Sequence, residues 1–176
     1  IGSALHNAGI DRLMFSLKNY GISPEHSKYS NMNDETIENS DKFTGLIIKN
    51  AVDPFVGKLT YLRILSGTLK ASDSFYVVQE DSNEKFSHLY IPRFDKNEEI
   101  EEASLGDIVV IPKLKNSKIG QTVVSAGQNV IVKVPDFPEP MISKSISPKS
   151  KNEIDKITGA LSKLSESDPT FKWEFD

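Results

Sequence analysis

The amino-acid sequence predicts a mainly β protein: a closed β-barrel preceded by a helix and followed by a partial α+β unit of β-α-β order. Two observations lead to this prediction. Between residues 42 and 135, short β-branched or aromatic runs alternate with turn signals and leave no room for a long helix. On both sides of that region, apolar residues recur at helical spacing. A closed barrel is expected because closure removes exposed strand edges.

The first expected element is a helix over residues 9–20. One face of it is apolar and is formed by Ile10, Leu13, Met14 and Leu17. Gly21 and Pro24 then supply the usual signals that end a helix. The polar residues 25–41, rich in Asn and Ser, are expected to form a linker.

Seven strands are expected in the barrel region. They are the β-branched or aromatic runs Phe43–Lys49, Lys58–Leu65, Ser74–Val78, Phe86–Pro92, Asp107–Ile111, Thr122–Ser125 and Val130–Val134. Pairs such as Asp53-Pro54 and Ser66-Gly67 mark the turns between them. The second run is apolar on both faces, which is typical of a strand with packing on each side.

A proline-rich connection, residues 136–140, precedes the last part of the chain. There we expect a strand over Met141–Ser147, then a helix with Ser150 as its N-cap, and a final strand over Phe171–Phe175. About 40 residues cannot bury the apolar faces of such a unit alone. The aromatic segment Phe171–Phe175 is therefore expected to be poorly ordered, to pack against the barrel, or to make weak contacts with a second copy.

Composition excludes several classes of protein. The 176 residues include 21 Lys+Arg and 25 Asp+Glu, and the net charge of −4 argues against a protein that wraps nucleic acid through bulk positive charge, so no DNA partner is expected. The absence of cysteine excludes a disulfide scaffold, a thiolate metal site and a cysteine nucleophile, and we expect a cytoplasmic setting. No apolar run approaches the roughly 20 residues that span a bilayer, so no membrane partner is expected.

The residues show no recognisable catalytic or metal-binding constellation. The three histidines are scattered, without the short ligand spacings of a zinc site. The acidic run Glu98–Glu102 is interpreted as a solvated strand or loop rather than as catalytic carboxylates. Taken alone, Lys113, Lys115 and Lys118 could equally contact phosphate or solvate a loop.

Three sets of motifs nevertheless occur in a specific order. Asp53-Pro54-Phe55-Val56-Gly57-Lys58-Leu59 is followed by R-x-x-S-G-T-L from Arg63 and by Gly106-Asp107. In this order they resemble domain II of bacterial elongation factor G. Pro138-Glu139-Pro140, Ile146-x-Pro148-Lys149-x-Lys151 and Asp168-Pro169-Thr170-Phe171 resemble the start of domain III of that family. Gly2-Ser3-Ala4 resembles the last guanine-nucleotide motif of its GTPase domain.

The resemblance implies a division of the chain. Residues 1–24 would end a GTPase domain, 25–41 would be a linker, 42–135 would be a translation-protein-type barrel, and 141–176 would be half of a ferredoxin-like domain III. The chain also opens at Ile1 within the pattern of a structured segment, so we expect it to be part of a longer protein. The stretch Leu89–Asn97 differs from the sequence that the family usually has at this place, which indicates a divergent, elongation-factor-G-like branch.

The resemblance also implies a function for the parent protein. It would bind GTP and Mg²⁺, dock on the small ribosomal subunit, and couple hydrolysis to the movement of tRNA and mRNA. Hydrolysis needs a phosphate-binding loop, a Mg²⁺ ligand and a water-positioning residue, and this sequence contains none of these motifs. The fragment itself is therefore expected to be non-catalytic and to hold no cofactor.

The same resemblance supplies candidate binding residues. Ser3, Ala4 and Leu5 would form an incomplete guanine loop. The candidate contacts to small-subunit ribosomal RNA are basic and lie in or after the domain II signature: Lys58, Arg63, Lys113, Lys115 and Lys118. A cross-strand ion pair is the alternative role for Arg63. The alternative function is a stand-alone β-barrel module that binds a ligand or a protein and has no part in translation.

Overall fold

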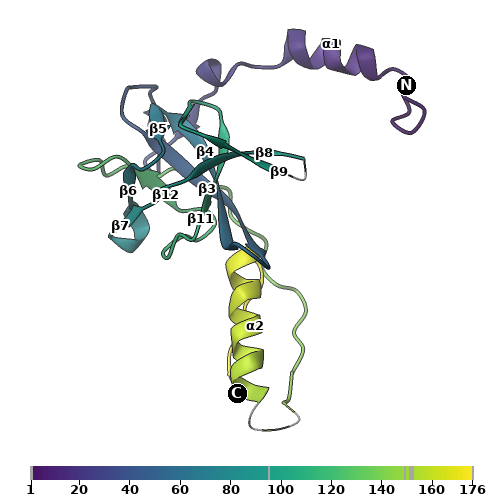
Figure 1. Ribbon diagram of the computed structural model, residues 1–176, viewed down its shortest axis with the longest axis vertical. Coiled ribbons are helices and arrows are strands. Elements are labelled where there is room, and N and C mark those ends of the chain that lie inside the picture. Colours follow the sequence, from purple (N-terminus) through teal and green to yellow (C-terminus); the bar gives the residue numbers. More distant parts are fainter. Residues whose placement is uncertain (1, 95, 149, 151–152, 176) are drawn as a thin grey trace.

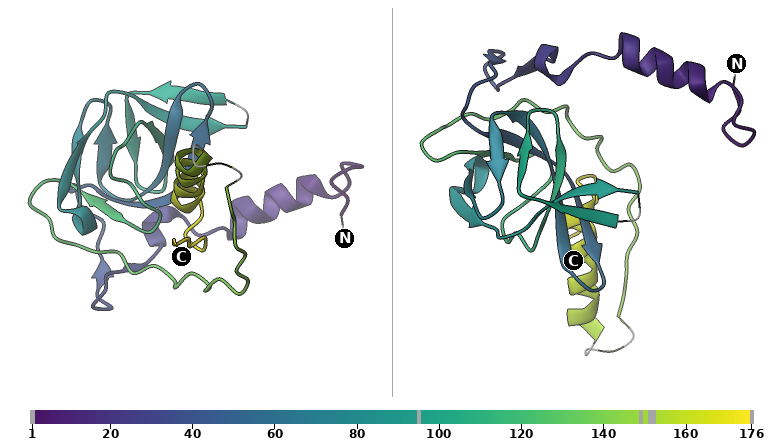
Figure 2. Two further views of the ribbon diagram at one scale, coloured as in Figure 1. Left: turned by 90° about the horizontal axis from the view of Figure 1, so that it is seen from below. Right: turned by 45° about the horizontal axis from the view of Figure 1, so that its top comes forward.

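The computed structural model describes residues 2–94, 96–148, 150 and 153–175. Figure 1 shows a curled β-sheet with helix α1 (Ile10–Tyr20) on the N-terminal side and helix α2 (Ile154–Ser167) extending from the other side. Both helices were predicted. Helix α1 has no buried residue, and it stays apart from the sheet in both views of Figure 2.

The main sheet has eight antiparallel strands in the order β7-β6-β12-β3-β4-β11-β8-β9. Their bounds are β3 (Thr44–Asp53), β4 (Gly57–Ser66), β6 (Ser74–Val77), β7 (Ser82–Lys85), β8 (Leu89–Arg93), β9 (Lys96–Ile100), β11 (Ile108–Pro112) and β12 (Thr122–Val124). Smaller ladders pair β1 (Tyr29–Ser30) with β2 (Thr36–Ile37), and β5 (Thr68–Lys70) with β10 (Glu102–Ser104). Two 3-10 helices, η1 (Pro24–His26) and η2 (Val78–Glu80), complete the elements.

One hydrophobic core lies inside the curl of the sheet. Its buried side chains come from strands throughout the sheet and include Ile47, Leu62, Phe75, Leu89, Val109 and Val123. The ring of Phe75 lies 6.3 Å from that of Phe43 and 5.5 Å from that of Phe86, measured between centroids. The mainly β prediction is confirmed. Among the described residues the ladder runs from β7 to β9, and no ladder joins those two end strands.

The strand predictions differ from the structure at several places, and strands β5 and β7 were not predicted. The predicted run Val130–Val134 contributes only an isolated bridge, between Asn31 and Val132. The acidic run Glu98–Glu102, interpreted as a solvated strand or loop, falls largely within strands β9 and β10, which are mostly exposed and pair with β8 and β5. The predicted strand Phe86–Pro92 begins at Leu89.

The C-terminal unit contains the helix but not the two flanking strands. Residues 141–148 are irregular and exposed, with Met141 97% accessible. Residues 171–175 are also irregular, so both strand predictions were wrong. Alternating apolar and polar residues define the two faces of a possible strand, but a strand also needs a neighbouring strand to hydrogen-bond with. No described segment pairs with residues 141–148 or 171–175. The contacts of Phe171–Phe175 with a second copy stay a prediction.

Helix α2 also begins later than expected. Its N-cap is Glu153, and the N–H of Glu153 donates to the backbone carbonyl of Ser150 at 3.1 Å. At the other end, the Ser165 hydroxyl donates to the carbonyl of Phe171 at 3.3 Å, which turns the C-terminal segment back along the helix (Figure 1). Asp95 of the divergent stretch, and Lys149 and Lys151 of the domain III motif, lie outside the described residues.

None of the described helices is both long enough and apolar enough to cross a membrane.

Candidate functional site

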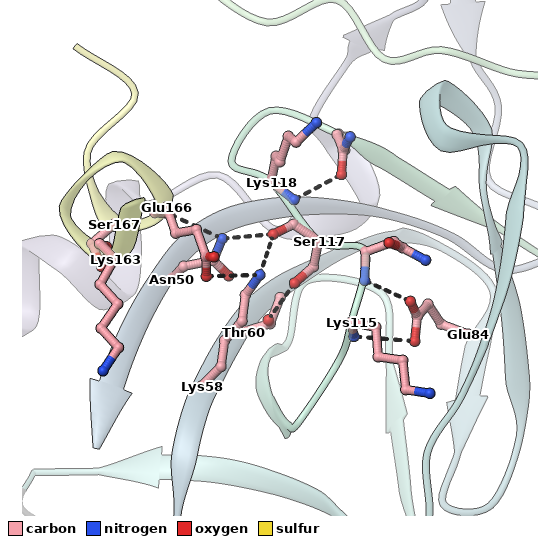
Figure 3. A network of polar contacts seen from close by, with 12 residues as sticks. Asn50, Lys58, Thr60, Glu84, Lys115, Ser117, Lys118, Lys163, Glu166 and Ser167 are labelled. Carbon is pink, nitrogen blue, oxygen red and sulfur yellow. Dashed lines mark hydrogen bonds and ion pairs between the residues drawn. The ribbon is translucent and has the colours of Figure 1, made fainter. Parts of the chain in front are cut away.

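Three of the predicted basic residues lie on the loop that joins β11 to β12. We call residues 113–118 the cationic loop. Lys113, Lys115 and Lys118 are exposed, whereas Leu114 and Ser117 between them are buried. The loop therefore directs its charges to solvent and its anchoring residues inward, at the end of the sheet next to α2 (Figure 3).

The backbone of the cationic loop is held by a buried carboxylate. Glu84 on β7 is 6% exposed and accepts the N–H of Asn116 at 2.7 Å and that of Lys115 at 3.4 Å. A buried carboxylate is tolerated only where such hydrogen bonds satisfy it. The N–H of Lys113 donates to the carbonyl of Lys58 at 2.8 Å, and the φ of Lys113 is 62°, a conformation that residues other than glycine seldom adopt. The loop is thus fixed in one conformation from several sides.

Ser117 is the innermost anchor of the loop. Its hydroxyl shares a buried hydrogen bond of 2.9 Å with the hydroxyl of Thr60 on β4. Its carbonyl accepts from Asn50 Nδ2 at 3.0 Å and from Lys58 Nζ at 2.8 Å. Two side chains from the β3–β4 hairpin therefore converge on one carbonyl of the loop (Figure 3).

The same two side chains reach helix α2. Asn50 Nδ2 also donates to the backbone carbonyl of Glu166 at 3.2 Å, and Lys58 Nζ lies 3.4 Å from Glu166 Oε2. The side chain of Lys58 is 18% exposed and that of Glu166 is 47% exposed. We call Asn50, Lys58, Ser117 and Glu166 the polar junction, because they join the sheet, the cationic loop and α2.

Lys118 is paired within the molecule. Its Nζ donates to Glu80 Oε1 at 2.7 Å, and Gln121 Nε2 donates to the same oxygen at 2.7 Å. These hydrogen bonds, that of Lys118 first, lower the pKa of Glu80 from its ordinary value. Throughout the part of the chain that is described, neither Lys113 nor Lys115 forms an ion pair through its side chain.

The remaining predicted residues lie elsewhere. Arg63 is half-buried on β4, with its guanidinium carbon 5.9 Å from the ring centroid of Tyr29, and its buried Nε has no hydrogen-bond partner among the described residues. Its cross-strand neighbours are Ile108 and Leu46, so the alternative role, a cross-strand ion pair, is not seen within the described part of the chain.

The residues of the expected guanine loop form a tight turn before α1. The N–H of Ser3 donates to the carbonyl of Ala8 at 3.0 Å, and the reverse bond is also 3.0 Å. Ala4 accepts the N–H of Asn7 at 3.1 Å, and Leu5 is exposed. This turn lies far from the cationic loop (Figure 2).

The lysines could be predicted from the sequence, but the side chains that position them could not. Asn50, Glu84 and Glu166 are far apart in the sequence and belong to no motif, so no local pattern could have indicated them. The pairing of β3 with β4 and the packing of α2 bring Asn50 and Glu166 together, whereas β7 places Glu84 against the backbone of the cationic loop.

Two family models match this chain. Residues 42–126 match elongation factor G domain 2, and residues 137–176 match elongation factor G domain III. The chain belongs to the elongation factor G family. The resemblance inferred from the sequence is thereby confirmed, and the family is one of translation elongation factors.

Relatives agree with this assignment. An elongation factor G-like protein of Thermotoga maritima is 42% identical over 182 aligned positions, which cover 99% of this chain and 27% of that protein. Elongation factor G of Salinibacter ruber is 34% identical over 184 positions, covering 99% of this chain and 26% of that protein. A crystal structure of a Thermus thermophilus protein superposes with a TM-score of 0.77 at 26% identity, covering 94% of this chain and 24% of that one. The chain thus spans about a quarter of the length of these relatives.

Proposed function

We propose that this chain is the part of a cytoplasmic, ribosome-associated GTPase that docks the protein on small-subunit ribosomal RNA. The observation that supports this most strongly is the cationic loop, where Lys113 and Lys115 are exposed and, among the described residues, free of ion pairs on a backbone held by buried polar groups. In the parent protein, GTP bound with Mg²⁺ is hydrolysed, and the hydrolysis drives movement of tRNA and mRNA.

The loop suits a phosphate backbone for physical reasons. Lysine acts as a point charge that positions a protein on phosphates without reading base sequence. A loop that is already rigid loses little conformational freedom when it binds, which favours affinity. Because the whole chain carries a net charge of −4, the contact is a local patch rather than a broad basic surface.

The five candidate residues contribute unequally to this proposal. Lys113 and Lys115 are the primary contacts because their ammonium groups are available. Lys118 contacts phosphate only if it releases Glu80, and Lys58 only if it releases Glu166. Arg63, stacked on Tyr29, is a separate candidate outside the cationic loop.

The fragment itself contributes docking rather than hydrolysis. Its sequence contains no phosphate-binding loop of the kind that hydrolysis requires. The Ser3–Leu5 turn supplies one edge of a guanine site whose remaining parts lie in the GTPase domain of the parent protein.

The proposal is tested with purified small ribosomal subunits. Binding of the 176-residue chain is measured by fluorescence anisotropy at several KCl concentrations from about 50 to 200 mM at constant Mg²⁺. The double substitution Lys113→Gln/Lys115→Gln should weaken binding and flatten the plot of log K against log [salt] by roughly 0.7 to 0.9 per lost contact. The matched control, Lys42→Gln/Lys96→Gln, removes two exposed lysines elsewhere on the barrel. It should change neither the affinity for the subunits nor the slope of log K against log [salt]. Equal behaviour of the two double variants would contradict the proposal.

A further inference from the structure

We propose that Lys58 is a conditional phosphate contact: while α2 is docked, Glu166 occupies it, and when α2 leaves, Lys58 adds its charge to the cationic loop. RNA binding and docking of α2 therefore oppose each other. This inference rests on the proposed RNA-binding role of the loop and assigns a means of regulating it.

The position of Lys58 supports the first step. Its ammonium donates to the carbonyl of Ser117, which lies within the cationic loop between Lys115 and Lys118. An ammonium has three donors, and the backbone bond uses one of them. Glu166 Oε2 lies 3.4 Å from the same nitrogen, at ion-pair distance. A phosphate held on the loop would thus approach a cation that is already fixed beside it (Figure 3).

The partner of Lys58 is exchangeable. Glu166 is about half exposed, and ion pairs of this kind contribute little net stability because water and salt compete with them. A phosphate oxygen offers the same charge-assisted hydrogen bond as a carboxylate. Lys58 can therefore move between the two anions without losing its bond to Ser117.

The end of α2 depends on the same groups. Glu166 lies in the last turn of α2, where the carbonyls have no partner within the helix. Asn50 Nδ2 satisfies the carbonyl of Glu166 at 3.2 Å, and the Lys58 cation lies beside the negative end of the helix dipole. Drawing Lys58 toward phosphate removes the charge that faces this helix end and so weakens its docking.

One polar atom of the polar junction also lacks a hydrogen bond. Asn50 Oδ1 is buried and has no hydrogen-bond partner among the described residues. A buried amide oxygen without a partner is unfavourable, so the docked arrangement is not held by a fully paired network. Because the coupling is a linkage between two binding events, each must weaken the other by the same factor.

The test uses Glu166→Gln, which removes the charge but keeps the backbone carbonyl that Asn50 binds. With small ribosomal subunits as the probe, this variant should bind more tightly than the wild-type chain at low salt. Its salt slope should be steeper by roughly 0.7 to 0.9, so its advantage should shrink about threefold between about 50 and 200 mM KCl. Asp155→Asn is the matched control, because it changes the net charge equally at the exposed opposite end of α2. It should leave the slope unchanged.

Lys58→Met/Glu166→Gln identifies the responsible cation and should return the slope to the wild-type value. A wild-type slope in Glu166→Gln, an equal change in Asp155→Asn, or a steep slope that persists in the double variant would each overturn the inference. Those results are distinct from failure of the proposed function, which would appear as unchanged binding in Lys113→Gln/Lys115→Gln.

Docking of α2 gives a second readout. The chain has no cysteine, so cysteines introduced at Ser87 and Lys156 can carry a fluorophore pair; the first site is exposed and the second lies on the outer part of α2. Adding small subunits should lower the transfer efficiency in the wild-type background and leave it constant in Lys58→Met. No change in the wild-type background, or an equal fall in both, would overturn the coupling.

Discussion

The carboxylate of Glu84 on β7 accepts the backbone N–H of Asn116 at 2.7 Å, although 32 positions separate the two residues. Strand β7 is a short edge strand of the main sheet, and the strand order alone assigns it no particular role. This hydrogen bond gives it a specific role, since it fixes the loop that presents Lys113 and Lys115. The edge of the sheet and the proposed RNA contact are thus physically connected.

The first prediction concerns this carboxylate. Glu84→Ala leaves the N–H groups of Lys115 and Asn116 without an acceptor, and it should lower the free energy of unfolding by about 2–3 kcal/mol. Urea denaturation measures the effect. Glu84→Gln, which retains one acceptor oxygen, should lose less. Glu101→Ala, at an exposed acidic residue, is the control and should stay within about 0.5 kcal/mol of the wild-type chain.

Much of the fold followed from local pattern. Helices α1 and α2 and most barrel strands could be predicted because their apolar residues recur at helical or strand spacing. Met141–Ser147 and Phe171–Phe175 were predicted as strands on the same ground. They are irregular, because strand formation also depends on a neighbouring chain segment that the spacing of side chains does not report.

The site was predictable to a smaller degree. The exposed lysines of the cationic loop stand out in the sequence, and their positions relative to the family motifs suggested a phosphate contact. The pairing of Lys58 with Glu166 could not be foreseen, because the two residues are far apart in the sequence and meet only where α2 packs on the β3–β4 hairpin. Long-range polar contacts of this kind carry no periodic signal.

The second prediction tests the core. The Phe75 ring packs between Phe43 and Phe86, so Phe75→Ala should cost about 3–5 kcal/mol through lost burial and a residual cavity. Phe55→Ala removes an equal side chain that is 96% exposed at the β3–β4 turn and should change stability by less than about 0.5 kcal/mol. Thermal and urea unfolding of the pair would show the contrast. A comparable loss in both variants would mean that the core is not centred on Phe75.

The third prediction concerns pH. The hydrogen bond from Lys118, followed by that from Gln121, lowers the pKa of Glu80 in the folded chain. A lowered folded pKa means that this carboxylate stabilises the fold above the unfolded pKa of roughly 4.3, and that the contribution is lost as the pH falls through the lower folded pKa. Lys118→Met should raise the pKa of Glu80 more than Gln121→Ala does. A carbon-detected NMR titration of the Glu80 carboxyl group measures both shifts, and the reverse order would contradict the assigned cause.

The last prediction compares two glycines that both have a positive φ. Gly67 has a φ of 67° and Gly127 a φ of 83°, so alanine at either position is strained by roughly 1–2 kcal/mol. A Cβ at Gly67 would also lie 2.6 Å from the carbonyl carbon of Lys42, whereas at Gly127 it would meet nothing within 4 Å. Backbone cannot move aside as a flexible side chain can, so Gly67→Ala should be clearly more destabilising than Gly127→Ala in urea denaturation. Equal losses would show that the conformation alone, rather than the close approach of residue 42, requires glycine after β4.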